Sequence, residues 1–290
     1  MRISSPERVA SYYRDTTAEY EAYGGAALSW NFGIWESGTR SIQAAFERGN
    51  EFLLRGIEVG PTTRVLDVGC GAGGLAIWCA TRLGCHVTGI TICDEHIGIA
   101  ERNATAAGVA DRCEFLCMDM DALTFASGSF DVVTNQETMC CAQDKRRYLR
   151  EVFRILAPGG TWSGIDYNVC SGRLSNANTG QLRKVIEGFH LPSLIPASRV
   201  ESHLRAAGFV DIRARDVSAL VLPSAELAMR RCYEPLRSAR RFPRRRLHSQ
   251  DRQQEASIRG HYEAGMAYSM GLHTGLFEHT WFRGRKAGPV

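Results

Sequence analysis

The residues with the clearest potential for chemistry are the acidic and glycine-rich residues 65–74, whose sequence is VLDVGCGAGG. Glycine tolerates positive φ and lets backbone N–H groups approach a ligand where any Cβ would collide. An apolar run at residues 64–68 precedes the glycines and a helical pattern at 74–83 follows them. The loop therefore joins a strand to a helix, at the place where parallel sheets bind their ligands.

The charge beside these glycines indicates which kind of ligand they hold. Asp67 lies two residues before Gly69, where it would repel a pyrophosphate and attract an ammonium group. The Gly69-x-Gly71-x-Gly73 spacing also departs from the G-x-G-x-x-G pattern of dinucleotide folds. Gly74 does complete a G-x-x-G from Gly71, so spacing alone leaves the dinucleotide alternative open. The acid favours a sulfonium cofactor with an amino-acid tail, S-adenosylmethionine.

Elements that could position this loop follow along the chain. Strands are predicted at 64–68, 86–92, 113–117, 130–134, 160–167, 209–216 and 276–284. Helices are predicted at 74–83, 94–107, 145–156 and 198–207, with a loop around 171–180 and a helix, basic interruption and helix over 224–270. The pattern predicts an α/β fold with a Rossmann-like, seven-stranded, mostly parallel sheet and helices on both faces. We divide it into an N-terminal helical lid (1–60), a core (61–222), a helical insertion that caps the substrate (223–272) and a final strand (273–290).

Composition excludes several classes of protein. The 290 residues are 44% hydrophobic and 23% charged, which excludes a disordered chain or a coiled coil. We find no apolar stretch of the ~18 residues that a membrane span needs and no signal peptide. Ten cysteines without a Cys-x-x-Cys pair favour a reducing compartment and no metal site. We therefore expect a cytoplasmic protein without a membrane partner.

A basic run at residues 237–246 contains six arginines. It has two interpretations: contact with the phosphates of a nucleic acid or a small diphosphate, or a solvated surface. Phe242 is the only aromatic residue among the arginines, unlike the interleaving of RNA-binding segments. We expect no nucleic-acid partner.

Residues 62–168 resemble the core of the class I S-adenosylmethionine-dependent methyltransferases. Five motifs carry the resemblance, at 65–74, 86–91, 117–121, 130–133 and 156–161. It implies S-adenosylmethionine as cofactor and S-adenosylhomocysteine as product. The resemblance places Gly69, Cys70 and Gly71 against the methionine end, near Asp67. It also places Asp119 on the adenine amino group, Met120 near the adenine ring and Asn135 near the methionine moiety.

The end of the second strand departs from most of this class, because Thr91 replaces the acid that holds the ribose. Residues 89–93 (GITIC) instead resemble the G-I-T-L-S branch of sterol, tocopherol and geranyl diphosphate C-methyltransferases. In that branch a glutamine approaches the ribose, and His96 aligns with it; Asp94 or Glu95 are alternatives. The predicted cofactor contacts are completed by Thr91, Ile92 and Trp30.

Residues 135–144 (NQETMCCAQD) resemble the E-A-T-C-H-A-P-D segment of sterol C-methyltransferases, with Glu137 and Cys140 matching and Cys141 in place of histidine. Methylating an alkene leaves a carbocation, which a buried carboxylate and aromatic faces stabilise. The resemblance therefore makes Glu137 a catalytic candidate that stabilises the cation or steers its deprotonation. The alternative is a carboxylate that caps the following helix.

Aromatic residues are concentrated near the N-terminus. Residues 12–21 and 28–35 resemble the Y-Y-D-x-x-T-D-F-Y-E and L-N-x-G-x-W segments of the same branch. They predict an aromatic lid over the sulfonium, with Tyr20 and Tyr23 as catalytic candidates. The alternative is a hydrophobic helix packed on the core. The arm closes over its own cleft or over that of a second copy in a homo-oligomer. The rings are Tyr12, Tyr13, Tyr20, Tyr23, Trp30, Phe32 and Trp35.

The resemblance leads us to expect a C-methyltransferase that acts on a small hydrophobic prenyl or terpenoid compound of secondary metabolism, such as a prenylated indole of the teleocidin type. Methionines and tyrosines in the insertion would wall its pocket, or they are ordinary core. Three alternatives stay open. They are an O- or N-methyltransferase with Glu137 or Tyr23 as base, a nucleic-acid methyltransferase, and a protein that binds the cofactor without transferring its methyl group.

Overall fold

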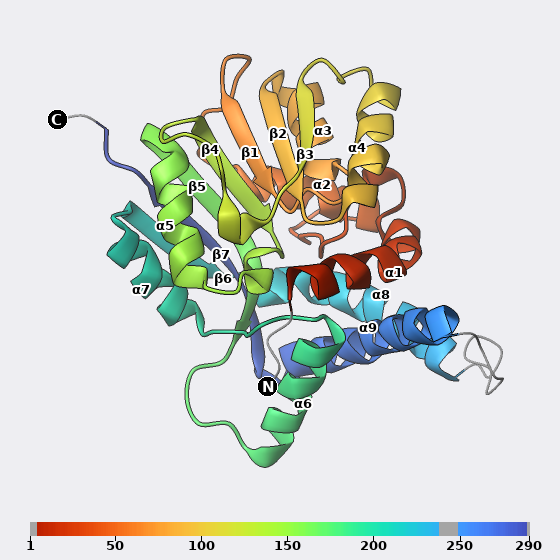
Figure 1. Cartoon of the computed structure of the whole chain (residues 1–290). Coiled ribbons are helices and arrows are strands. Elements are labelled where there is room, and N and C mark those ends of the chain that lie inside the picture. Colours follow the sequence, from red (N-terminus) through yellow and green to blue (C-terminus); the bar gives the residue numbers. More distant parts are fainter. Residues whose placement is uncertain (1–4, 238–248, 289–290) are drawn as a thin grey trace.

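The computed structural model describes residues 5–237 and 249–288, which form a seven-stranded sheet and the helices around it (Figure 1). The strand order is β3-β2-β1-β4-β5-β7-β6, with β7 antiparallel to both of its neighbours and β1 to β5 parallel. The mostly parallel α/β sheet predicted from the sequence is confirmed. The strands are β1 (Arg64–Val68), β2 (His86–Thr91), β3 (Cys113–Cys117), β4 (Phe130–Gln136), β5 (Leu156–Val169), β6 (Val210–Asp216) and β7 (Phe277–Arg285).

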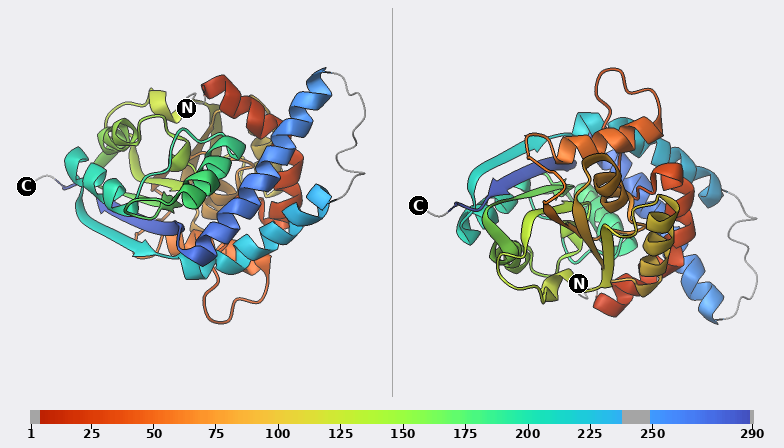
Figure 2. Two further views of the ribbon diagram at one scale, coloured as in Figure 1. Left: turned by 90° about the horizontal axis from the view of Figure 1, so that it is seen from below. Right: turned by 90° about the horizontal axis from the view of Figure 1, so that it is seen from above.

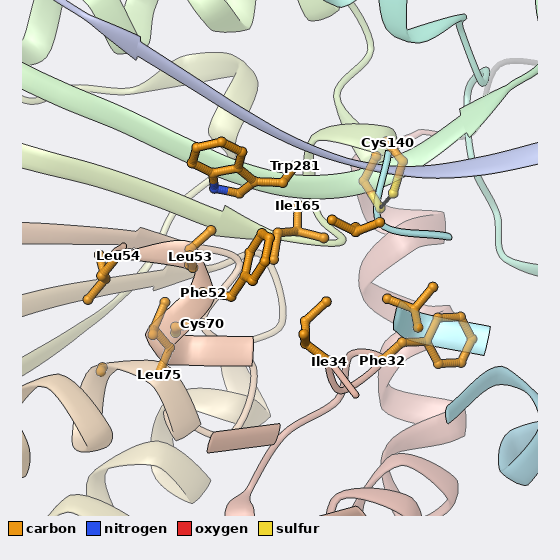
Figure 3. Packing of buried hydrophobic residues seen from close by; sticks show 14 of the residues in the cluster. Phe32, Ile34, Phe52, Leu53, Leu54, Cys70, Leu75, Cys140, Ile165 and Trp281 are labelled. Atoms are coloured by element: carbon orange, nitrogen blue, oxygen red, sulfur yellow. Dashed lines mark hydrogen bonds between the residues drawn. The ribbon is translucent and has the colours of Figure 1, made fainter. Parts of the chain in front are cut away.

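Both faces of the sheet are covered because the side chains of its central strands alternate between two apolar clusters. Val65 of β1 packs with the helices α2 (Ile42–Leu53), α3 (Gly74–Leu83) and α4 (Asp94–Ala106). Leu66, its neighbour, packs with α5 (Lys145–Ile155) and α7 (Ala197–Ala207) on the opposite face. Figure 3 shows Phe52 of α2 beside Trp281 of β7, with ring centroids 5.8 Å apart and an edge-to-face orientation.

The ligand crevice of such a sheet lies where the chain order reverses. Here β1 pairs with β2 on one side and with β4 on the other. The glycine loop follows β1, and residues 137–144 follow β4, so both segments begin at the same edge. The sheet topology therefore brings together the two stretches that the sequence marked as chemically important.

A layer of helices lies beyond this edge of the sheet (Figures 1 and 2). It consists of α1 (Pro6–Gly24), α6 (Asn176–Gly188), α8 (Ser218–Arg237) and α9 (Ser249–Thr274). The long helix α9 contacts the other three. It crosses α6 very closely at two glycines, Gly188 of α6 and Gly260 of α9. A Cβ placed on Gly188 would lie only 2.2 Å from the Gly260 carbonyl oxygen. None of the described helices combines the length and apolarity that a membrane span requires.

Some element boundaries differ from the sequence prediction. The prediction of a loop around residues 171–180 is wrong from residue 176 onward, because helix α6 begins there. The Ser175 hydroxyl caps that helix by accepting from the Asn178 N–H, and Val185 and Ile186 are buried. The helical insertion starts earlier than expected, at Ser218, and β5 starts at Leu156. The arginine run lies outside the described residues after Arg237.

Candidate active site

Contacts on both sides shape the glycine loop after β1. The N–H groups of Gly69 and Cys70 both donate to the Ile90 carbonyl, at 2.8 and 2.9 Å. Gly69 has φ 79°, and a Cβ there would lie 2.2 Å from Thr138 Cγ2. From α4, the Asn103 side-chain amide donates to the Ala72 carbonyl at 3.0 Å. The loop is thus held open by β2 and α4, and its first glycine cannot be replaced without a shift.

Asp67 has the chemistry expected of an ammonium-binding group. Its side chain is buried, and no hydrogen bond or ion pair to its carboxylate forms within residues 5–237 and 249–288. Burial alone raises the pKa of Asp67 to about 7. An uncompensated carboxylate is costly in such a place, and a cation beside it would lower the pKa and remove that cost. The residue therefore fits the amino group of a ligand bound in the loop.

A cavity opens at this edge of the sheet, with about 1280 Å³ of empty space including its mouth. The glycine loop, the end of β2 and the segment after β3 line one end, and Leu28, Ser29 and Trp30 cover it. The other end is lined by apolar and aromatic side chains from α1, from β5 and from the segment after α6, and by the loop after β4, which contributes Glu137. We call these the cofactor end and the acceptor end.

Most of the residues that the sequence assigned to the cofactor line this cavity together. Asn135 does not, and its predicted place near the methionine moiety is wrong. Its side chain is fully buried, with Oδ1 accepting from Trp162 Nε1 at 2.9 Å and from the Tyr148 hydroxyl at 3.2 Å. Side chains alternate along β4, so Asn135 turns away from the cavity while Gln136 lines it. The cavity-lining residues of the assigned set are Asp67, Gly69, Cys70, Gly71, Thr91, Ile92, His96, Asp119, Met120 and Trp30.

His96 lies between the cofactor end and the lid. Its Nε2 is 3.1 Å from Thr17 Oγ1 of α1, and its ring meets the Trp30 ring edge-on at 4.6 Å. Burial lowers the pKa of His96 to about 4, so the ring is neutral at physiological pH. The alternatives Asp94 and Glu95 do not line the cavity. Both pair with Arg14 of α1, at 3.3 and 2.8 Å.

The aromatic arm of the chain serves both purposes that the sequence left open. Tyr12, Tyr13, Tyr20 and Trp30 line the cavity, and Tyr20 stacks on Trp30 with centroids 5.5 Å apart. The remaining three rings pack elsewhere: Tyr23 meets Phe46 edge-on, Phe32 stacks on Tyr268, and the Trp35 indole donates to Ser224. Helix α1 lies over the cleft of its own chain.

The two tyrosines proposed as catalytic therefore differ. Tyr23 does not line the cavity, so the structure contradicts its assignment as a base. Tyr20 does line it, and its hydroxyl lies 3.1 Å from the Tyr12 hydroxyl. Burial raises the pKa of Tyr20, which keeps the phenol protonated. Tyr20 can wall the cavity and donate a hydrogen bond, but it is poorly suited to act as a base.

Glu137 is held by groups from three distant parts of the chain. One carboxylate oxygen, Oε1, accepts from the Phe32 backbone N–H at 2.6 Å, and Oε2 accepts from the Tyr167 hydroxyl. His279 Nε2 lies 3.2 Å from Oε1. The residue has φ 53°, an uncommon conformation for a non-glycine residue. The helix-cap alternative is wrong, since the carboxylate has these partners instead of the short turn at Met139–Cys141.

Sequence reasoning missed Tyr167 and His279 as partners of Glu137. They are directly opposite each other in the antiparallel pair of β5 and β7. The sequence does mark His279 as unusual, because it lies between Phe277 and Trp281 on the apolar face of an alternating strand. A histidine in that position needs a polar partner, but the identity of the partner depends on the strand order.

The charges around the cavity have one sign. Its charged lining groups are the carboxylates of Asp67, Asp119, Asp121 and Glu137, and none of the described residues that line it is a lysine or an arginine. Nor do the described residues contain a group of three His, Cys, Asp or Glu side chains placed to hold a metal ion. The cavity therefore favours cationic over anionic ligands.

A family model described as a methyltransferase domain matches residues 65–160. The 27-O-demethylrifamycin SV methyltransferase of Amycolatopsis mediterranei (strain S699) is 31% identical over 206 residues, which are 71% of this chain and 75% of that protein. The chain belongs to the class I S-adenosylmethionine-dependent methyltransferases. This chain is also 30% identical to the 24-methylenesterol C-methyltransferase 2 of Oryza sativa subsp. japonica, over 77% of this chain and 59% of that protein. The crystal structure of the [4+2]-cyclase SpnF matches with a TM-score of 0.79 and 24% identity, covering 98% of this chain and 97% of the other, and shows the shared fold.

The cofactor end of the methyltransferase fits S-adenosylmethionine, which supplies an electrophilic methyl group on a sulfonium. The orphaned carboxylate of Asp67 suits the amino group of the methionine tail. The glycine loop lines the cavity and packs closely against its neighbours, because a Cβ at Gly69 would meet Thr138 and a Cβ at Gly71 would lie 3.0 Å from the Trp30 ring. Asp119 lines the cavity beyond the end of β3 and is suited to accept from the adenine amino group.

Proposed function

We propose that this methyltransferase methylates a carbon atom of a small hydrophobic acceptor, an alkene of a prenyl or terpenoid group, through a carbocation. The observation that carries the proposal is the Glu137 carboxylate, buried at the acceptor end and surrounded by aromatic rings. When the alkene attacks the sulfonium methyl group, positive charge develops on the acceptor. A fixed carboxylate and ring faces lower the energy of that charge in a site that excludes water.

The contacts of Glu137 prepare it for this role. Hydrogen bonds from Phe32 N–H and from Tyr167 fix the orientation of the carboxylate before the cation forms, so no reorganisation is needed during the reaction. The same carboxylate can then take a proton from the carbon next to the cation. The C–H bond breaks, its electrons form a new double bond, and the proton goes to a Glu137 oxygen.

The lining of the cavity also bears on the class of acceptor. A free diphosphate needs cations, and the described lining residues offer none at either end. The acceptor we propose is therefore an uncharged molecule that carries its prenyl group into the acceptor end, such as a prenylated indole or another terpenoid of secondary metabolism. Tyr12 and Tyr13 from α1 would close over it, and Phe189 and Leu191 would contact its hydrocarbon chain.

The test is turnover of a panel of prenylated compounds with methyl-labelled cofactor, using Glu137→Gln as the main variant. We expect a loss of about a hundredfold or more in kcat, because the amide carries no charge, with cofactor affinity unchanged. Glu226→Gln is the matched control. Glu226 pairs with a histidine, His273, at 3.3 Å, much as Glu137 lies near His279, but that pair is on the surface. Unchanged turnover by Glu137→Gln would contradict the proposal.

Methylation of oxygen is the second candidate, because the rifamycin relative is named for a transfer at a 27-O position. Glu137 would then act as a general base toward an acceptor hydroxyl, since Tyr23 does not line the cavity. The two candidates are separated by the product: only the first forms a new carbon–carbon bond.

A further inference from the structure

A line of polar groups continues from Glu137 away from the cavity, on the side of the helical layer. His279 of β7 lies next to Glu137, and Tyr268 of α9 lies next to His279 on its other side. Neither side chain is among the residues that line the cavity, and both are fully buried. They belong to elements more than a hundred residues away from Glu137 in the sequence.

The position of His279 is fixed by its own backbone and by the neighbouring rings. Its N–H donates to the Ser218 hydroxyl at 2.8 Å, and its carbonyl accepts from the Val217 N–H at 2.8 Å. The Tyr167 and Tyr268 rings pack edge-on against the imidazole, with centroids 5.1 and 6.2 Å away. The ring has little room to turn in this packing.

The two ring nitrogens of His279 have different surroundings. Nδ1 lies 2.9 Å from the Tyr268 hydroxyl, in hydrogen-bond geometry. Nε2 lies 3.2 Å from Glu137 Oε1 but forms no hydrogen bond with any described residue. This nitrogen is wholly buried and close to a carboxylate oxygen, but it lacks the alignment of a hydrogen bond, so a small shift of the Glu137 carboxylate would complete the contact when the site is loaded.

The Tyr268 hydroxyl can determine the tautomer of this histidine. Burial raises the pKa of Tyr268, so the phenol keeps its proton and is available to donate to Nδ1. A neutral imidazole that accepts at Nδ1 carries its hydrogen on Nε2, facing Glu137. In this state the histidine would donate to the carboxylate, once the two are aligned, without adding a positive charge, and the pair would keep a net charge of −1. An imidazolium in the same place would cancel the charge that a carbocation requires.

We propose that His279 is a positioning residue for Glu137: Tyr268 holds it as the neutral tautomer with hydrogen on Nε2, and the imidazole orients the carboxylate toward the acceptor without neutralising it. This inference rests on the proposed function of Glu137 as the group that meets the cation. It assigns no proton transfer to His279.

The first experiment compares two replacements of His279 with the wild-type enzyme on a prenylated acceptor. Phenylalanine keeps a planar ring and removes the donor, so we expect His279→Phe to lower kcat about tenfold to a hundredfold with KM unchanged. Glutamine can present an N–H from a similar position, so His279→Gln should recover most of the loss. A purely structural role predicts no such recovery by glutamine and no separation of kcat from KM.

Two further variants complete this comparison. Tyr268→Phe removes the hydroxyl that sets the tautomer and should lower kcat without raising KM, which also provides the test if His279→Phe does not fold. His273→Phe is the matched control, since His273 pairs with Glu226 on the surface, and it should leave turnover unchanged. Full activity of both His279→Phe and Tyr268→Phe would overturn the proposal.

The second experiment needs no methyl transfer. Calorimetry in the presence of S-adenosylhomocysteine compares a prenyl-chain tertiary ammonium, which imitates the cation, with the neutral hydrocarbon of the same shape. We expect the wild-type enzyme to prefer the ammonium, and His279→Phe to lose that preference while binding the hydrocarbon equally well. If the preference and its loss are seen but no alkene is methylated, the proposed function fails and the inference about His279 stands. If alkenes are methylated and His279→Phe keeps the preference, the inference alone fails.

Discussion

Replacing Asp67 with asparagine should change the pH dependence of stability in a direction fixed by its burial. The pKa of Asp67 is about 7 in the folded protein and about 3.8 when exposed. Between these values the folded state keeps a proton that the unfolded state releases, so the free energy of unfolding of the cofactor-free enzyme falls as pH rises. The full effect is about 4 kcal/mol, from about three pKa units at 1.36 kcal/mol each. Asparagine does not ionise, so the free energy of unfolding of Asp67→Asn should not fall with rising pH on account of this residue.

Urea unfolding of the cofactor-free wild-type enzyme and of Asp67→Asn measures the difference directly. From about pH 5 to about pH 8 the variant should gain about 2–3 kcal/mol relative to the wild type, because the rest of the pKa window lies below pH 5. Asp131→Asn is the control, and it should be less stable than the wild type by an amount that does not change between pH 5 and pH 8. The Arg64 side chain lowers the pKa of Asp131, and its ionised form is the stabilising one. A difference between Asp67→Asn and wild type that does not change with pH would refute the reasoning.

Cofactor binding should show the converse pattern. An ammonium beside Asp67 requires the ionised carboxylate, so wild-type affinity for S-adenosylmethionine should weaken about tenfold for each pH unit below about 7. The variant should bind weakly, with no such slope. Isothermal titration across the same pH range tests this, and equally tight binding by Asp67→Asn would show that the carboxylate does not hold the cofactor amino group.

Three further outcomes are expected. Gly69→Ala should weaken cofactor binding at least about tenfold and lower the melting temperature, because the left-handed conformation alone costs about 1–2 kcal/mol and the new Cβ meets Thr138; wild-type-like binding would contradict the loop geometry. Asn135→Ala should cost about 2–4 kcal/mol in urea unfolding by leaving the Trp162 indole without its acceptor, while the Kd for cofactor stays unchanged. Tyr23→Phe should leave kcat and KM unchanged in steady-state assays. A large drop in kcat would show that the Tyr23 hydroxyl takes part in catalysis after all.

Local patterns in the sequence predicted the strands and turns well, because they are set by alternation and by breaker residues. The central strand β1 was found at its observed bounds, and so was α3 after the glycine loop. Helix α6 was missed since its first turn, Asn176–Gly180, has the composition of a loop. Its stability comes from the Ser175 cap and from packing of its last turn on α9, and the second of these is a tertiary contact.

In the candidate site, too, local sequence patterns predicted some residues, and others depend on tertiary contacts. Residues of the cofactor end lie within single loops, so a motif with the right spacing places them together. Asn135 was misplaced because one residue along a strand reverses the face to which a side chain points. His279 and Tyr167 reach Glu137 only through the antiparallel pairing of β5 with β7, and spacing in the sequence does not encode that pairing.

The most direct test of the account is the chemical position of the transferred methyl group. The enzyme would be incubated with ¹³C-methyl S-adenosylmethionine and a prenylated acceptor, and the product examined by ¹³C NMR. We predict a labelled methyl bonded to a former alkene carbon, with a new double bond next to it. A label on oxygen or nitrogen, or a cofactor that stays intact while the acceptor is converted, would contradict it.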